Sequence, residues 1–157
     1  MSRPIISRAR SRLALLNYEL RRLYFVHFWK MDIQKGTRIS LSAKLDKTNP
    51  SGVHIGRNTA IAFRSAIITH DFINGKHKDV FIGDNCLIGA GVIILPGVRV
   101  GNNCIVSANS VVLQNVPSGS VVIGNPAKIV QGNIITGPHG TRRPAIESPR
   151  ETSDVML

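Results

Sequence analysis

The sequence predicts an all-β solenoid, in which short strands stack as coils around a narrow core. From residue 82 to residue 117 an aliphatic residue recurs at every sixth position, at Ile82, Ile88, Ile94, Val100, Val106 and Val112. A small or branched residue follows each of them four positions later. Neither the period of a helix nor the alternation of a half-buried strand gives this spacing. A short fixed repeat is instead typical of stacked architectures.

Three such hexads make a triangular coil of eighteen residues. At that spacing Ile82 falls over Val100 and Cys86 falls over Cys104. Paired strands lie about 4.8 Å apart, and each coil buries its inward residues against its neighbours. The glycines, asparagines and aspartates that follow the aliphatic residues suit corners with unusual backbone angles. The same register extends back through Ile67, Ile61, Ile55, Leu45, Ile39 and Ile33.

Two segments interrupt the repeat. Residues 46–52 add four residues to one hexad, and Ile82 follows Ile67 by fifteen positions instead of six, so we expect a loop at 73–80. Loops that interrupt a regular scaffold commonly carry function. The segment after Ile67 is therefore the first place to expect a functional site.

The composition divides the chain into three parts, with residues 31–131 as the solenoid. Residues 1–30 carry a net charge of +6 out of +11 for the whole chain, and residues 11–29 read as a helix. This helix caps the open end of the coils or touches anionic lipid. Its charged residues exclude a transmembrane span, and it lacks a signal-peptide core. Residues 132–157 are predicted to form an irregular tail that is extended or disordered, or that instead wraps a neighbouring subunit.

Several classes of function are disfavoured. The positive charge is dispersed or terminal, and aromatic residues make up only 5% of the chain, so we expect no nucleic-acid binding. The spacing of His54, His70 and His77 does not match that of metal ligands, so we expect no metal. Cys86 and Cys104 could form a disulfide, but buried free thiols in a reducing compartment are the favoured interpretation.

His70 is the candidate catalytic residue, because it lies just before the loop at 73–80. A neutral imidazole can take a proton from an alcohol near neutral pH, and a carboxylate that orients the ring helps. Asp71 is adjacent, and Asp79 and Asp84 lie near the end of the loop. Without the surrounding repeat, a histidine here would more often be a solvated surface residue.

The hexads, the Thr69-His70-Asp71 segment and the sequence GNPAK at 124–128 together resemble the hexapeptide-repeat acyltransferases. Within that superfamily, the chain is most similar to bacterial exopolysaccharide and lipopolysaccharide O-acetyltransferases, which share the sequence DKTNP found here at 46–50. The resemblance implies a left-handed parallel β-helix, a homotrimer with active sites between subunits, and acetyl-CoA as the acyl donor.

The same resemblance implies roles for individual residues. His70 matches the general base, and Asp71 is the carboxylate expected to orient it. Asp84 is the alternative carboxylate. The backbone N–H groups at Gly89 and Ala90 of an adjoining subunit would bind the oxyanion.

The acyl donor is expected along the coils. Its pantetheine arm would pass Ala90 and Ala108, where small side chains permit close approach. Lys128 would lie near the nucleotide phosphates. Relatives often have Thr-Lys where this chain has Leu113-Gln114, which removes one expected cation.

The predicted function is acetyl transfer from acetyl-CoA to a hydroxyl of a sugar, in the precursor of a cell-surface polysaccharide. We expect a cytoplasmic protein, with peripheral contact at the inner membrane face through residues 1–30. A sugar-amine N-acetyltransferase, a serine acetyltransferase and a non-catalytic β-helix assembly module are the alternatives. Binding of CoA and loss of activity without His70 would separate the enzymes from the assembly module.

Overall fold

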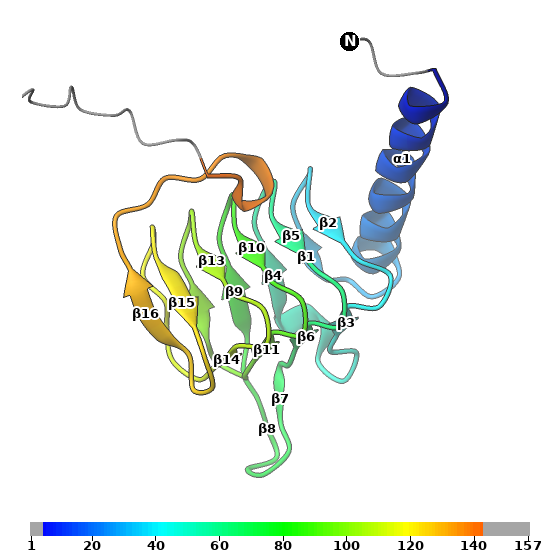
Figure 1. Cartoon of the computed structure of the whole chain (residues 1–157). Helices are drawn as coiled ribbons and strands as arrows, with labels where there is room; N and C mark the ends of the chain where they lie inside the picture. The colour runs from blue at the N-terminus through cyan, green and yellow to red at the C-terminus, as the bar shows by residue number, and fades with distance from the viewer. Residues whose placement is uncertain (1–4, 143–157) are drawn as a thin grey trace, which may run out of the picture.

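The computed structural model of this protein describes residues 5–142 and shows a left-handed parallel β-helix with one helix at its N-terminal end (Figure 1). The predicted fold class is confirmed. Short strands of two to four residues alternate with turns, because each hexad supplies one strand and one corner.

Three parallel sheets form the sides of the prism, and each is built from strands of successive coils. The first sheet contains β1 (Asp32–Ile33), β4 (Val53–Ile55), β9 (Val80–Ile82) and β12 (Arg99–Val100). The second contains β2 (Arg38–Ile39), β5 (Ala60–Ile61), β10 (Leu87–Ile88), β13 (Ile105–Val106) and β15 (Val121–Ile123), with β16 (Lys128–Gln131) antiparallel at its edge. The third contains β3 (Lys44–Leu45), β6 (Ala66–Ile67), β11 (Ile93–Ile94) and β14 (Val111–Val112).

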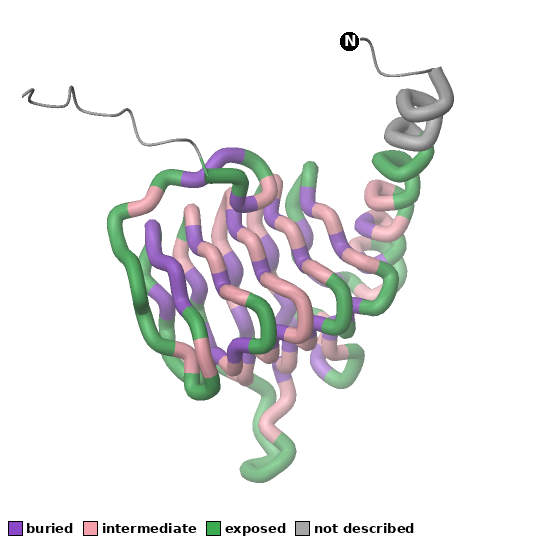
Figure 2. The backbone as a smooth tube through the Cα atoms, viewed as in Figure 1, coloured by how far each residue is buried: buried purple, intermediate pink, exposed green. Residues whose placement is uncertain are grey.

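The strand register confirms the eighteen-residue coil. Ile82 pairs with Val100, and Ile88 pairs with Val106. The repeated aliphatic positions are almost completely buried and form one continuous core, whose inner faces run as purple bands through the coils in Figure 2. Cys86 and Cys104 are free and buried in this core, as expected.

The prism has three corners, which we number by the sheets that they join. The first corner lies between the first and second sheets and carries Asn58, Asn85 and Asn103, all with positive φ. The second corner joins the second and third sheets and contains residues 89–91 and 107–109. The third corner joins the third and first sheets, and both interruptions of the repeat begin there.

Helix α1 (Ile5–His27) begins six residues earlier than expected and ends two residues before Trp29. It packs on β1 and β2 at the end of the coil stack, where Phe25 and Met31 are buried. The buried Arg22 donates a hydrogen bond from Nη1 to the carbonyl of Ile33 at 2.9 Å. No helix in residues 5–142 is long and apolar enough to cross a membrane.

The described part of the tail, residues 132–142, is irregular but packed against the coils, which corrects the expectation of an extended or disordered segment. It runs back along the first corner and contains a short 3-10 helix, Pro138–Gly140. Thr136 donates from Oγ1 to the carbonyl of Asn85 at 2.6 Å, and the ring of His139 lies 2.9 Å from the carbonyl of Gly36. These bonds span several coils. The expectation for residues 143–157 lies outside the described residues.

Candidate active site

The two interruptions of the repeat meet at the third corner. Leu45 pairs with Ile67 in the third sheet, so the segments that follow them leave the sheet at neighbouring levels. The first interruption contains the 3-10 helix Pro50–Gly52. The second forms a hairpin of β7 (His70–Asp71) and β8 (Lys76–His77), which projects from the coils in Figure 1.

The first interruption braces the base of the hairpin. The Asp46 carboxylate accepts hydrogen bonds from the N–H groups of Thr48 at 2.8 Å and Thr69 at 3.0 Å. Thr69, which is fully buried, donates from Oγ1 to the carbonyl of Asn49 at 2.8 Å, and Asn49 Nδ2 donates to the Thr69 carbonyl at 3.3 Å. Thr69 immediately precedes His70. The backbone next to His70 is therefore held through both the N–H and the carbonyl of Thr69.

Burial raises the pKa of the Asp46 carboxyl, but the hydrogen bonds that it accepts outweigh burial and leave this pKa below its ordinary value. Asp46 is therefore ionised near neutral pH, and its interaction with the Thr69 N–H is charge-assisted. Sequence reasoning missed Asp46 and Asn49 as parts of the site. The signal was present, since both interruptions begin directly after paired residues of the predicted coils.

His70 lies half-buried on β7. Its ring centroid is 4.1 Å from that of Phe72 and 5.1 Å from that of His77, which faces it across the hairpin. Its Nδ1 atom is buried and has no hydrogen-bond partner among residues 5–142. Buried polar atoms are nearly always hydrogen-bonded in folded proteins. An unsatisfied ring nitrogen beside a projecting loop is therefore consistent with a functional residue.

The carboxylates expected beside His70 are engaged elsewhere in the described structure. Asp71 accepts hydrogen bonds from Asn74 Nδ2 at 2.8 Å and Lys78 Nζ at 3.1 Å. The bonds from Asn74 and Lys78 lower the pKa of Asp71 to about 2. Neighbouring residues on a strand point to opposite faces, so Asp71 closes the hairpin rather than orienting the ring of His70.

Asp84, the alternative carboxylate partner expected for His70, lies at the first corner. Its carboxylate accepts a hydrogen bond from the Arg57 N–H at 2.7 Å, and its own N–H donates to Asn102 Oδ1 at 2.8 Å. It therefore belongs to a ladder of polar groups that joins successive coils. Neither acid forms a hydrogen bond with His70 within the described part of the chain.

The residues expected to contact the acyl donor share the second corner. Gly89 cannot carry a side chain there, because a Cβ atom would lie 2.7 Å from the backbone of the next coil. Ala90 and Ala108 occupy the same corner one coil apart, and the Ala90 carbonyl accepts a hydrogen bond from the Asn109 N–H at 2.8 Å. The exposed Lys128 follows the turn at residues 124–127, which bonds to the strand that leaves this corner.

One expectation at this corner needs correction. The Gly89 N–H donates to the Val106 carbonyl at 2.8 Å and is not free to bind an oxyanion. The Ala90 N–H has no hydrogen-bond acceptor among the described residues. Of the two proposed donors, only Ala90 is available.

His70 and this small-residue edge lie at different corners of one chain. His70 leaves the third corner, whereas Ala90 and Ala108 lie at the second, and the whole width of the third sheet separates them. One chain therefore cannot bring these groups together. A site that uses both requires a second copy that places its own edge beside the hairpin.

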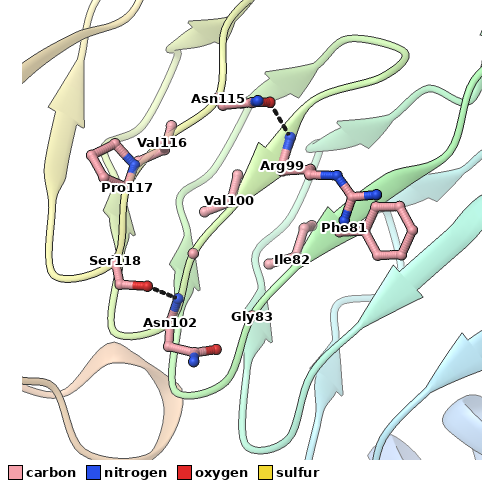
Figure 3. A pocket seen from close by; sticks show the side chains of 11 residues that line it. Phe81, Ile82, Gly83, Arg99, Val100, Asn102, Asn115, Val116, Pro117 and Ser118 are labelled. Atoms are coloured by element: carbon pink, nitrogen blue, oxygen red, sulfur yellow. Dashed lines mark hydrogen bonds between the residues drawn. The ribbon is translucent and has the colours of Figure 1, made fainter.

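An open groove lies on the first sheet, outside the His70 hairpin. Its volume is about 560 Å³, and it extends from Phe81 and Arg99 to Ser118 (Figure 3). The Arg99 guanidinium covers the Phe81 ring at 3.8 Å, and the His54 ring stacks on Phe81 at 4.3 Å. These contacts form a ladder of side chains along the sheet and stiffen it. No group of three or more possible metal ligands occurs in residues 5–142.

Comparison with known proteins agrees with the repeat and the fold. Residues 79–114 match the family described as bacterial transferase hexapeptide (six repeats). YvoF of Bacillus subtilis (strain 168), an acetyltransferase by name, is 36% identical over 75 residues, which cover 46% of this chain and 44% of YvoF. The match thus spans less than half of the length of that relative.

Two solved structures share the architecture. A maltose O-acetyltransferase from Clostridium difficile 630 is 26% identical with a TM-score of 0.57, and the match covers 73% of this chain and 75% of that one. The polysialic acid O-acetyltransferase OatWY is 25% identical with a TM-score of 0.55, and the match covers 78% and 61%. The chain thus carries the hexapeptide repeat of bacterial transferases and shares the fold of these two O-acetyltransferases.

Proposed function

We propose that this protein is an acyl-CoA-dependent O-acetyltransferase that acts on a sugar hydroxyl, with His70 as the general base. The observation that carries the proposal is the braced hairpin, which presents an imidazole with an unsatisfied, buried Nδ1 at one corner of the β-helix. Both interruptions of the repeat contribute to the hydrogen bonds that hold the backbone next to this side chain.

In the proposed reaction, the imidazole of His70 accepts the proton of the acceptor hydroxyl as its oxygen attacks the thioester carbonyl. A tetrahedral oxyanion forms and then collapses, and the carbon–sulfur bond breaks. The thiolate of CoA leaves and takes the proton from the imidazolium. The products are the acetyl ester and free CoA, and His70 returns to its neutral form.

The acyl donor would lie along the second corner of a neighbouring copy. Small side chains at Ala90 and Ala108 leave room for the pantetheine arm, and Lys128 supplies a positive charge toward the phosphates of CoA. The free Ala90 N–H is suited to stabilise the oxyanion. Because His70 lies at the third corner, this arrangement calls for a cyclic assembly. We propose a homotrimer, in which each site lies between two subunits.

A sugar is the proposed acceptor. The maltose and polysialic acid O-acetyltransferases, which share the fold at 25% identity or more, are both named for carbohydrate acceptors. We propose a precursor of a cell-surface polysaccharide, acetylated in the cytoplasm, and the basic N-terminal segment suits a lipid-linked form of it at the inner membrane face.

The test is the activity of a His70→Ala variant with acetyl-CoA and a panel of nucleotide sugars and glycans. General-base catalysis contributes about 100-fold to 10,000-fold to a rate, so we expect a loss of that size with unchanged secondary structure and mass. Lys44→Ala is the control, since this exposed residue lies on the outer face of the third sheet. Near-normal turnover by His70→Ala would refute the proposed base.

A further inference from the structure

Helix α1 carries an apolar stripe that nothing in residues 5–142 covers. Leu13, Leu16, Leu20, Tyr24 and Phe28 follow one another at intervals of three or four residues, and each is between 47% and 69% exposed. Residues at this spacing share one face of a helix. Figure 2 shows the exposed side of α1 turned away from the coils.

The opposite face of α1 fixes the orientation of this stripe. Phe25 is buried in the core, Arg22 bonds to the carbonyl of Ile33, and Arg21 donates to the carbonyl of Leu41 at 2.9 Å. The helix therefore cannot roll to bury its leucines against its own coils without breaking these contacts. A solvent-facing apolar stripe of this length is uncommon on a monomer and marks an interaction surface.

Two partners could cover this stripe, a second copy of the chain or a lipid surface, and the charge of residues 1–30 distinguishes between them. Residues 1–30 contain seven Lys and Arg residues and a single acid, Glu19. Glu19 is paired with Arg22 at 2.6 Å, and the segment that carries the stripe has a net charge of +6. Copies of this helix would repel one another, whereas a negatively charged lipid surface would attract it.

The aromatic end of the stripe fits the same partner. Tyr24 and Phe28 stack with their ring centroids 5.5 Å apart, beside the partly buried Trp29. Aromatic side chains favour the boundary between headgroups and acyl chains. Basic amphipathic helices with leucines on the apolar face lie in that boundary.

We propose that α1 docks the protein on anionic lipid, with the Leu13–Phe28 stripe inserted among the acyl chains and the basic residues on the headgroups. This inference rests on α1 alone and does not depend on acyl transfer. It would stand if His70 proved to be dispensable.

The test is co-sedimentation of the full chain with vesicles of phosphatidylcholine, alone or mixed with phosphatidylglycerol. We expect binding at least about 10-fold tighter to the anionic vesicles, and weaker binding at high salt. The Leu16→Gln/Leu20→Gln variant should bind the anionic vesicles about 10-fold more weakly than the unmodified chain does, because two inserted leucines become polar.

The matched control is Ile123→Gln/Ile135→Gln, which replaces two similarly exposed aliphatic residues far from α1. It should bind the vesicles as the unmodified chain does. Equal binding by the Leu16→Gln/Leu20→Gln variant and the unmodified chain would overturn the proposal. The proposal would also be overturned if the unmodified chain did not bind vesicles and the Leu16→Gln/Leu20→Gln variant had a lower molecular mass in light scattering. In that case the stripe would contact a second copy of the chain.

Discussion

Replacing Asp46 with alanine tests the brace that holds His70. The change removes the acceptor of the Thr48 and Thr69 N–H bonds. Thr69 is fully buried, so its N–H loses its partner without gaining water. Leaving one buried donor unsatisfied costs about 1–3 kcal/mol. For a chain of this length, a loss of about 2 kcal/mol lowers the melting temperature by about 4–8 °C.

The effect on activity should exceed the effect on stability. Thr69 directly precedes His70 on the chain, so loosening its backbone displaces the imidazole from the acceptor hydroxyl. A misplacement of about 1 Å can cost about 100-fold in rate. We therefore expect kcat to fall by roughly that factor at a temperature where the variant is folded, with little change in the KM for acetyl-CoA. Steady-state kinetics and thermal unfolding of the same preparation measure both effects.

Two variants sharpen this test. Asp46→Asn keeps one acceptor oxygen and should recover part of kcat. Asp84→Ala removes another carboxylate that bonds to a backbone N–H, but at the first corner, so it should leave kcat near that of the unmodified protein. If Asp46→Ala retains full kcat, or if Asp84→Ala loses as much, the brace does not position His70.

Three further outcomes follow from the structure. Because Asn74 and Lys78 hold the pKa of Asp71 near 2, its stabilisation of the hairpin is complete above its ordinary pKa and disappears as the pH falls toward about 2. The protection factors of the amides in residues 70–78, which correct for the intrinsic pH dependence of exchange, should therefore fall over that range, and in Asp71→Asn they should no longer change with pH. Gly89→Ala should destabilise the fold by about 1–3 kcal/mol, because its Cβ would meet the backbone of the next coil. Gly132→Ala, with open space around it, should leave the melting temperature nearly unchanged and serves as its control. The two buried free cysteines should react with a thiol reagent only after denaturation, and the absence of reactive thiols in denaturant would reveal a disulfide instead.

The hexad period was enough to predict the coils, because it depends only on local spacing. Each aliphatic position from Ile33 to Val112 became an inward-facing core residue at the expected register. The predicted N-terminal helix was found with different ends, and its packing on the first coil could not be derived from periodicity. The packed tail was also missed, since the bond from Thr136 to Asn85 joins residues far apart in sequence.

The candidate site was predictable only in part. The position of His70 before an interruption was visible in the sequence, but the partners of its neighbours were not. Asp71 is adjacent to His70 on the chain, yet strand geometry turns its carboxylate toward Lys78. Asp46 is distant in sequence, yet the pairing of Leu45 with Ile67 brings it to the backbone of Thr69. Side-chain direction and coil stacking decided these contacts.

The central claim is that each site combines His70 of one copy with the small-residue edge of another, and mixed assembly tests it most directly. A His70→Ala variant and an Ala108→Trp variant, which blocks the edge, should each be inactive alone. When the two are refolded together in equal amounts, random trimers should recover about one quarter of the normal activity, because that fraction of interfaces joins an intact His70 to an intact edge. Mixed trimers that form and recover no activity would contradict a site shared between subunits.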